Sequence, residues 1–230
     1  WLAGPWQARD GVWIGLFLLS SVAVGLVSLL RSTAAEGVTS AEASGKMTPA
    51  NVLGACVLGL SALLGAALVA RSNFGTTEWG FFGLLAAATL VLGRLRREFV
   101  PLPWIAALAG GALLGGWDAS FVSGDTTRFL LTTTAYGALF AIGGFVAAFG
   151  ESGARKPGAW ASLSSVVALA AFGIAWNGVR DSYTGWGTAA LGLGVAFVGA
   201  ALPFAKRRPE YDGALAAFAV DGVDGAGALQ

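Results

Sequence analysis

Residues 79–117 read WGFFGLLAAATLVLG, RLRREF and VPLPWIAALAGGALLGGW, and this stretch decides the fold. Two apolar runs flank a six-residue turn that holds Arg94, Arg96 and Arg97. A helix needs about 20 mostly apolar residues to cross the bilayer core. The stretch therefore predicts a helical hairpin that crosses a membrane twice and carries positive charge at its tip.

Composition supports the same class of protein. Hydrophobic residues make up 56% of the 230 residues and charged residues only 12%, whereas soluble domains carry about 25% charged residues. So few charges could not cover the surface of a soluble fold of this length. We therefore expect an all-α polytopic transmembrane bundle that extends over residues 1–230 as one integral-membrane region.

Seven apolar runs are long enough, or nearly long enough, to span a bilayer, and none contains Asp, Glu, Lys or Arg. A charge at the centre of a spanning helix costs about 2.5–3.5 kcal/mol on insertion scales, so this partition supports the seven spans. The third run is short and covers only about 22 Å at the helical rise; Arg94 would snorkel, the bilayer would thin, or the helix would be buried among its neighbours. The runs are 12–30, 52–70, 79–93, 100–117, 129–149, 160–176 and 186–204.

The distribution of Lys and Arg predicts the orientation. The loops after the first, third, fifth and seventh runs hold ten of these residues, and the segments on the other side hold four. Cytoplasmic loops carry the excess of Lys and Arg, so loops 94–99 and 206–212 are expected in the cytoplasm and the visible N-terminus outside. Because the chain starts at Trp1 rather than Met, we expect a piece of a longer protein with an odd number of spans upstream.

A pair of similar segments indicates an internal repeat. RSNFGTTEWG at 71–80 matches RDSYTGWG at 180–187, and each opens an apolar run that ends in a basic cluster. A period of four helices gives a parallel repeat with units 49–156 and 157–230, the second incomplete, and places the start of an eighth helix near residue 214. Asp221 and Asp224 interrupt that helix, so either it fails or these acids face protein or water. Similar loop composition without duplication is the alternative.

The residue types exclude several kinds of chemistry. Histidine is absent and Cys56 is the only cysteine, so no internal disulfide and no His- or Cys-based metal site is expected. The three lysines lie in loops, which excludes a Schiff base inside the bundle, and no phosphate-binding glycine loop appears. We predict no catalytic, cofactor-binding or metal-binding residues and no nucleic-acid partner; whether the chain is an enzyme stays open, with the balance against it.

Small residues and tryptophans indicate how the helices meet each other and the bilayer. Pairs of small residues four apart let helix backbones approach closely and predict helix packing, self-association or contact with other membrane subunits. Tryptophans at the ends of the runs predict an aromatic belt at the membrane surface. The pairs are Ser21/Gly25, Ser61/Gly65, Gly111/Gly115 and Ala196/Ala200, and the tryptophans are Trp79, Trp117, Trp160, Trp176 and Trp186.

Two sets of polar residues are the remaining candidates for function. Hydroxyl groups within the runs are expected to bond their own helix backbone rather than a substrate; they are Ser20, Ser21, Ser28, Ser61, Thr89, Thr132, Thr133, Thr134, Tyr136, Ser162, Ser164 and Ser165. Charged residues of the outer loops could form a ring that binds a polar headgroup, or a solvated rim with weak ion pairs. They are Asp118, Asp125, Arg128, Arg180 and Asp181, with Arg71 and Glu78 beside them.

Segments such as RLRREFVPLPWIAALAGGALLGGW and WGTAALGLGVAFVGAALPFAKRRPE resemble a bacterial family of very long multi-pass proteins, the predicted membrane proteins of domain-of-unknown-function family 2339. The resemblance implies a bacterial inner-membrane protein with many more spans and supplies no catalytic residues. Three functions follow as hypotheses. The first is a structural or assembly component of an envelope system, the second a transporter or lipid-handling protein, and the third an envelope enzyme with an outer-face site.

Overall fold

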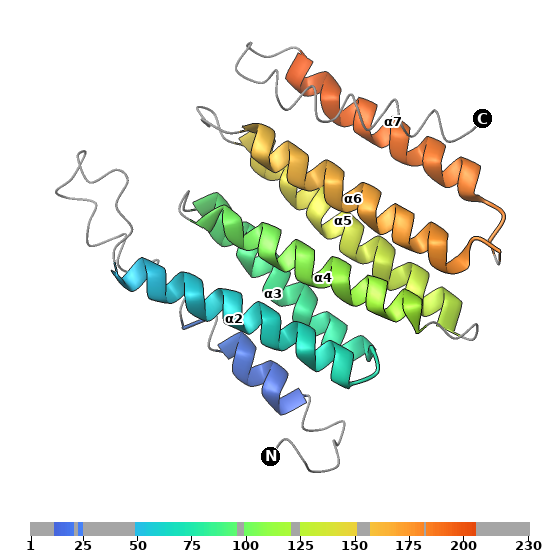
Figure 1. Ribbon diagram of the computed structural model, residues 1–230. Helices are drawn as coiled ribbons and strands as arrows, with labels where there is room; N and C mark the ends of the chain where they lie inside the picture. The colour runs from blue at the N-terminus through green and yellow to red at the C-terminus, as the bar shows by residue number, and fades with distance from the viewer. Residues whose placement is uncertain are drawn as a thin grey trace. The chain divides into compact units, whose positions relative to one another are not determined.

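The regular elements of the computed structural model are all helices within the residues that it describes, which are 12–20, 23–24, 49–95, 99–120, 125–150, 157–181 and 183–205. A helical stretch over residues 12–20 precedes six longer helices (Figure 1). Three of the six begin at a proline, which suits the first helical turn because its missing N–H has no partner there. The helices are α2 (Pro49–Arg71), α3 (Thr76–Leu95), α4 (Pro101–Ala119), α5 (Thr126–Gly150), α6 (Pro157–Val179) and α7 (Trp186–Ala205).

The predicted all-α class is therefore confirmed, and three helical segments are long and apolar enough to cross a membrane. These segments are Thr76–Leu95, Thr126–Phe149 and Gly158–Val179, while Cys56–Arg71 and Trp186–Leu202 are shorter apolar stretches. The eighth helix expected near residue 214 and the basic cluster at 206–208 lie outside the described residues.

Helix α3 corrects the expectation of a short third span. It runs over 20 residues, which covers about 30 Å, the thickness of the bilayer core. Glu78 lies in its first turn and Arg94 in its last, so these charges belong to the helix and not to the loops. The helix dipole favours an acid at the start and a base at the end, which explains why the helix extends past the apolar run on both sides.

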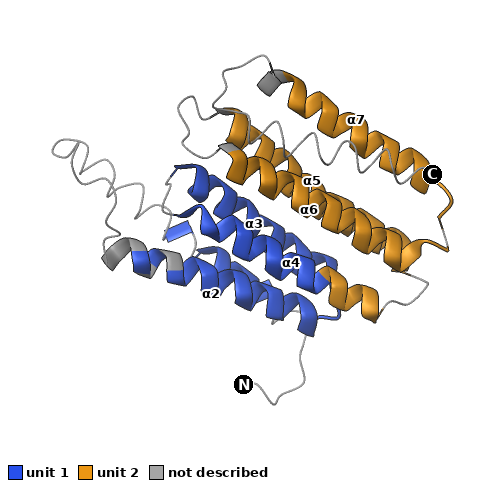
Figure 2. Cartoon of the chain, turned by 45° about the horizontal axis from the view of Figure 1, so that its top comes forward, with its two compact units in different colours: residues 1–113 blue, residues 114–230 orange. Residues whose placement is uncertain are grey.

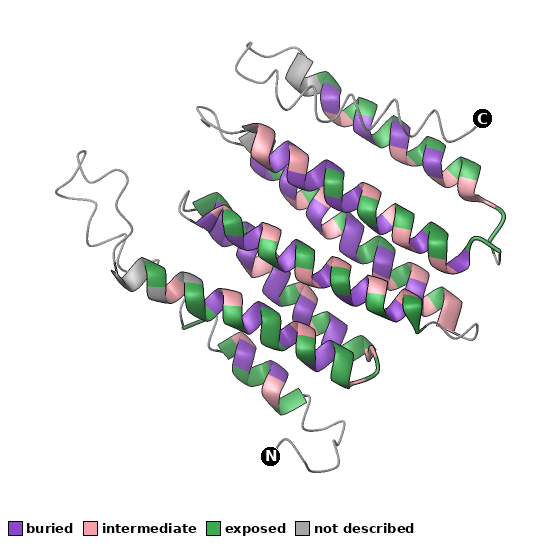
Figure 3. Ribbon diagram, viewed as in Figure 1, coloured by how far each residue is buried: buried purple, intermediate pink, exposed green. Residues whose placement is uncertain are grey.

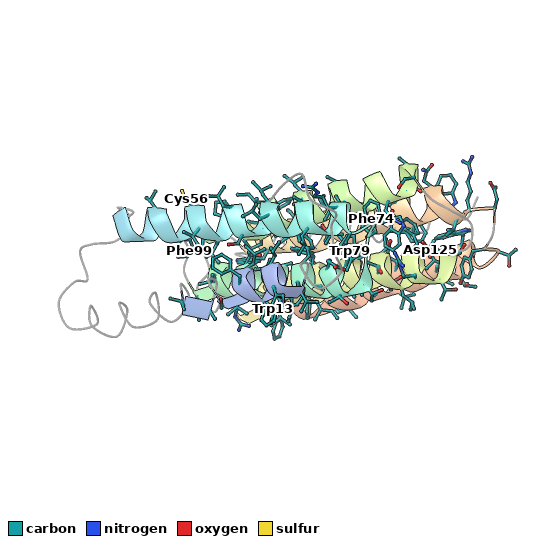
Figure 4. The ribbon with its side chains drawn as sticks, turned by 90° about the horizontal axis from the view of Figure 1, so that it is seen from below. Trp13, Cys56, Phe74, Trp79, Phe99 and Asp125 are labelled. Atoms are coloured by element: carbon teal, nitrogen blue, oxygen red, sulfur yellow. The ribbon has the colours of Figure 1, made fainter. Side chains whose placement is uncertain are left out.

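The outward faces of the helices are apolar along their length. Large aliphatic side chains in the middle of the helices are exposed, with Leu108 at 71%, Leu131 at 67% and Ile142 at 64% of their surface accessible. Exposed positions recur along every helix (Figure 3). Trp13, which is 70% exposed, and Cys56 also point outward (Figure 4). A surface of this kind suits lipid rather than water as the surrounding medium.

The chain groups into two compact units, residues 1–113 and 114–230 (Figure 2). In the first unit, Leu18, Leu58, Leu85, Leu92, Phe99 and Leu102 form a buried cluster. The stretch over 12–20 lies very close to α3. A Cβ added to Gly15 would collide with the Phe81 ring. Gly65 of α2 meets α3 in the same way, since a Cβ there would lie 2.9 Å from Leu85 Cδ1.

In the second unit, α5 and α6 form a closely packed pair built on small residues. A Cβ on Gly144 would lie 2.8 Å from the Trp160 carbonyl oxygen, and one on Gly137 would lie 3.0 Å from Ala171 Cβ. The Ser164 hydroxyl donates a hydrogen bond of 2.6 Å to the carbonyl oxygen of Ala141 across this contact. Small residues permit the close backbone approach that membrane helices use in place of a hydrophobic drive.

The predicted small-residue pairs differ in whether they lie at a contact between helices. Ser61 and Gly65 lie on the face of α2 that meets α3, with Ser61 only 4% exposed. At Gly111 and Gly115, by contrast, an added Cβ would meet no described atom within 4 Å, so no close helix approach requires glycine at these two positions within the described chain. The pair Ser21/Gly25 lies outside the described residues.

The tryptophans expected in a belt lie near the ends of their helices, and they differ in burial. Trp176 is 45% exposed at the end of α6, as a belt residue would be, but Trp79, Trp117 and Trp160 are buried. Trp79 packs edge-on against Phe82, and Trp117 packs edge-on against Phe129 with ring centroids 5.3 Å apart. These buried tryptophans fill space between helices, because a large ring contributes more by packing than by facing the headgroups.

The turn between α2 and α3 contains two residues in the left-handed region, Asn73 with φ 54° and Phe74 with φ 59°. The Phe74 amide donates to the Val69 carbonyl oxygen at 3.0 Å, which is the six-to-one bond that closes a helix in a Schellman motif. Asn73 then occupies the position that needs positive φ. This turn reverses the chain within four residues and brings α3 back along α2.

Candidate functional site

Several of the charged residues predicted in the outer loops contact a neighbouring side chain. In the second unit, Asn177 Nδ2 donates a hydrogen bond of 2.6 Å to Asp118 Oδ2, which joins the end of α4 to the end of α6. Gly178 lies against the Asp118 carboxylate and the Phe129 ring, and leaves no room for a Cβ. The carboxylate of Asp118 thus has a structural contact at the helix ends.

The two arginines that the structure describes in this unit lie over aromatic rings. The Arg128 guanidinium is 5.0 Å from the centre of the Trp117 ring, and that of Arg180 is 5.7 Å from Trp176. Arg180 Nε also lies 3.9 Å from Asp181 Oδ1, and both side chains are largely solvent-exposed. An exposed pair at this distance contributes about 0–1 kcal/mol, so these contacts hold side chains in place rather than build a reactive centre.

The predicted ring of charges is not gathered into a metal site or a carboxylate pair in the described chain. No group of three or more His, Cys, Asp or Glu able to hold a metal ion occurs among those residues. Arg71 and Glu78 belong to the first unit, with Glu78 buried at 7% exposure beside Gly75. Asp125 lies directly before α5. The sequence analysis assigned these residues to outer loops, whereas Arg71, Glu78, Asp118 and Arg128 lie in the first or last turns of helices.

Some of the hydroxyl groups within the apolar runs bond their own helix backbone, as expected. Thr89 donates to the Ala86 carbonyl oxygen and Ser165 to that of Ala161, both within their own helices. Ser164 instead donates across to α5. Among the described residues, Thr133 is the exception in this set: it is 1% exposed and its hydroxyl oxygen has no hydrogen-bond partner.

Thr133 lines a cavity that the sequence did not reveal. The cavity has a volume of about 520 Å³ and lies between α5, α6 and α7 of the second unit, within the range of about 300–1,000 Å³ usual for ligand sites. Most of its wall consists of alanine, glycine, leucine and phenylalanine, and its polar lining residues are Thr133, Thr134, Tyr183 and Trp186. Small residues that recur along α5 and α6 were the available signal, because they leave space wherever a third helix does not pack closely.

Aromatic contacts fix one end of this cavity. The Trp186 ring packs edge-on against Phe172 of α6, with ring centroids 5.6 Å apart, and against Tyr183, with centroids 5.2 Å apart. The Trp186 indole nitrogen is buried and, within the described chain, has no hydrogen-bond partner. The start of α7 therefore brings a second unpartnered polar atom to the cavity wall.

Fold and site together define a helical protein with the features of a membrane protein and a largely apolar cavity between three of its helices. Comparisons with family models, with curated proteins and with solved structures find no match to this chain. What can be said of its activity therefore rests on its own residues.

Proposed function

We propose that the chain is a polytopic protein of the bacterial inner membrane with seven spans, formed by the run at 12–30 and by α2 to α7. The apolar outward faces and the position of charges at helix ends support this proposal. The bacterial inner membrane follows from the resemblance to domain-of-unknown-function family 2339. Loops 94–99 and 206–212 face the cytoplasm in this proposal, because they carry the excess of basic residues.

A parallel repeat with units 49–156 and 157–230 is part of the proposal. Helices α2 and α6 both begin at a proline and both have 23 residues, while α3 and α7 both have 20. The intervening turns differ in their hydrogen bonds, since the Phe74 amide donates to the Val69 carbonyl oxygen five residues back and the Tyr183 amide to the Val179 carbonyl oxygen four residues back. Duplication followed by divergence of the turn accounts for both facts.

The role that we propose is that of a structural or assembly component of an envelope system. The observation that carries this role is that polar side chains form hydrogen bonds between helices. Ser164 joins α6 to α5, and Asn177 joins α6 to Asp118 of α4. Polar contacts of this kind hold helices together, and they leave broad apolar faces for lipid or for other membrane subunits.

Crosslinking in intact cells, followed by mild extraction and mass spectrometry, tests this role. We expect a membrane subunit, or a second copy of the chain, to be recovered in stoichiometric amount. Recovery of the chain alone, with crosslinks only within itself, would overturn the assembly role.

Lipid handling is the second candidate, because the cavity between α5, α6 and α7 is a specific observation in its favour. The outer-face enzyme gains no comparable support. Asp118 contacts Asn177, and Asp181 lies beside Arg180, so neither carboxylate is aimed at a shared reacting position.

A further inference from the structure

The two ends of the cavity between α5, α6 and α7 differ in polarity. Helices α5 and α7 begin, and α6 ends, at the same end of the second unit (Figure 1). The polar lining residues Thr133, Tyr183 and Trp186 belong to the part near this end, and the lining at the other extreme is formed by Ala141, Ala168 and Ala196. One end of the cavity is thus polar and aromatic, and the other is purely apolar.

Its length matches one leaflet of a bilayer. The lining of α5 runs from Leu130 to Ala141, which is about 16 Å at the helical rise. A bilayer core is about 30 Å thick, so one leaflet is about 15 Å deep. A hydrocarbon chain that enters at the polar end would therefore be accommodated over most of the depth of a leaflet.

The two unpartnered atoms specify the chemistry at the polar end. The indole N–H of Trp186 can only donate a hydrogen bond, whereas the Thr133 hydroxyl can donate or accept. A buried polar group without a partner costs about 1–3 kcal/mol. Both atoms are covered in the structure, so a rotation of each side chain toward the cavity would let an acceptor oxygen of a ligand bond and stabilise it. A carbonyl oxygen at the head of an acyl chain supplies that acceptor and places the hydrocarbon in the apolar part.

We propose that this cavity binds one acyl chain with its carbonyl oxygen at Trp186 and Thr133. The inference rests on the membrane placement proposed above and deepens the lipid-handling candidate. A diacyl glycerolipid and a free fatty acid share this chemistry. Tyr183 and Trp186 line the polar end, and Ala141, whose carbonyl oxygen accepts the bond from Ser164, lines the apolar end.

Gly192 offers a way to fill the cavity without disturbing its walls. It lines the cavity, and a Cβ there would meet no described atom within 4 Å. Gly199 lies two turns further along α7, has the same open surroundings and does not line the cavity. Gly192→Leu thus occupies the space of the acyl chain, and Gly199→Leu is a matched control on the same helix.

Removal of the polar atoms is a second, independent variant. Thr133→Val keeps the shape of the side chain and removes the unpartnered hydroxyl, so the fold is expected to be unchanged or more stable without ligand. Thr89→Val removes a buried hydroxyl in the first unit that has a partner in its own helix, and serves as its control. Trp186→Phe removes the indole N–H and keeps an aromatic ring.

The experiment is native mass spectrometry of the full chain after detergent washing, with dioleoyl phosphatidylglycerol and oleate added in separate titrations. We expect the original protein and Gly199→Leu to retain one molecule of at least one probe, and Gly192→Leu to lose about tenfold in affinity. Thr133→Val and Trp186→Phe should each lose about two- to tenfold, with Thr89→Val unchanged. The preferred probe identifies the source of the chain.

Two results would overturn the inference. The first is retention of neither probe by the original protein, and the second is equal retention by Gly192→Leu and Thr133→Val. Cysteine labelling at the two ends of α3 tests the membrane crossing separately. A protein that crosses the membrane and binds no acyl chain would contradict this inference alone.

Discussion

The hydroxyl of Ser164 lies 2.6 Å from the carbonyl oxygen of Ala141 and donates a hydrogen bond to it. The bond joins α6 to α5, although a serine in a membrane helix commonly bonds its own backbone. It forms beside Gly144, where the backbones approach most closely. The small residues therefore let the backbones of α5 and α6 come close together, and this short distance allows the Ser164 hydroxyl to bond the other helix.

Loss of this bond should weaken the second unit measurably. Ser164→Ala removes the donor and adds no volume, so we expect the free energy of unfolding to fall by about 0.6–1.7 kcal/mol, the range for bonds between membrane helices. Ser165→Ala, which loses a bond within its own helix, is the control and should have the smaller effect. Reversible unfolding in mixed micelles measures both. An effect of Ser164→Ala no larger than the control would contradict this role.

Gly144 should tolerate no side chain. A Cβ there would meet the Trp160 carbonyl oxygen at 2.8 Å and Ser164 Cβ at 2.9 Å, so Gly144→Ala should separate the helices and cost about 1–3 kcal/mol. Gly173→Ala in α6 has open space around the new Cβ and should be neutral or stabilise by up to about 1 kcal/mol through helix propensity. Thermal unfolding in detergent compares the two. Equal unfolding temperatures for the two variants would contradict the close approach of the helices at Gly144.

The turn between α2 and α3 should depend on the left-handed conformation of Asn73. With φ at 54°, Asn73→Gly should be neutral or slightly stabilising, whereas a β-branched residue should cost about 1–2 kcal/mol. Asn73→Val is the informative variant, since Asn73 is exposed and its side chain contributes little packing. The difference in unfolding free energy between the two variants tests the turn. Equal stability of the Gly and Val variants would argue against it.

The bond between Asn177 and Asp118 should be sensitive to the donor and insensitive to the charge. Asn177→Ala removes the donor, and we expect a loss of about 0.5–1.5 kcal/mol. Asp118→Asn keeps a carbonyl oxygen as acceptor and should have a smaller effect. Unfolding experiments on both single variants and on the double variant yield their coupling energy. A coupling energy of zero would show that this contact contributes nothing.

The sequence predicted the helices well because composition alone largely determines where a membrane helix forms. The apolar runs after residue 49 correspond to α2 to α7. The helix ends were less accurate, since residues such as Glu78 and Arg94 were assigned to loops. Charged side chains are compatible with the first and last turns of a helix, so apolar runs underestimate helix length.

Side-chain environments were beyond the reach of the sequence. Trp117 and Trp160 lie near helix ends as predicted, but their burial between helices was not foreseen, because a helix that is apolar on all sides does not reveal which face meets its neighbours. The cavity at Thr133 was missed for the same reason. It arises where α7 lies beside α5 and α6 without packing closely against them.

The central claim is that this chain crosses a membrane, and α3 provides the most direct measurement of it. In a Cys56→Ser background, single cysteines at Thr77 and Leu95 mark the two ends of a helix about 30 Å long. Both positions are exposed. A membrane-impermeant thiol reagent on intact cells, with any outer membrane permeabilised, should label position 77 and spare position 95, and lysis should expose both. Equal labelling of the two positions in intact cells would contradict the account.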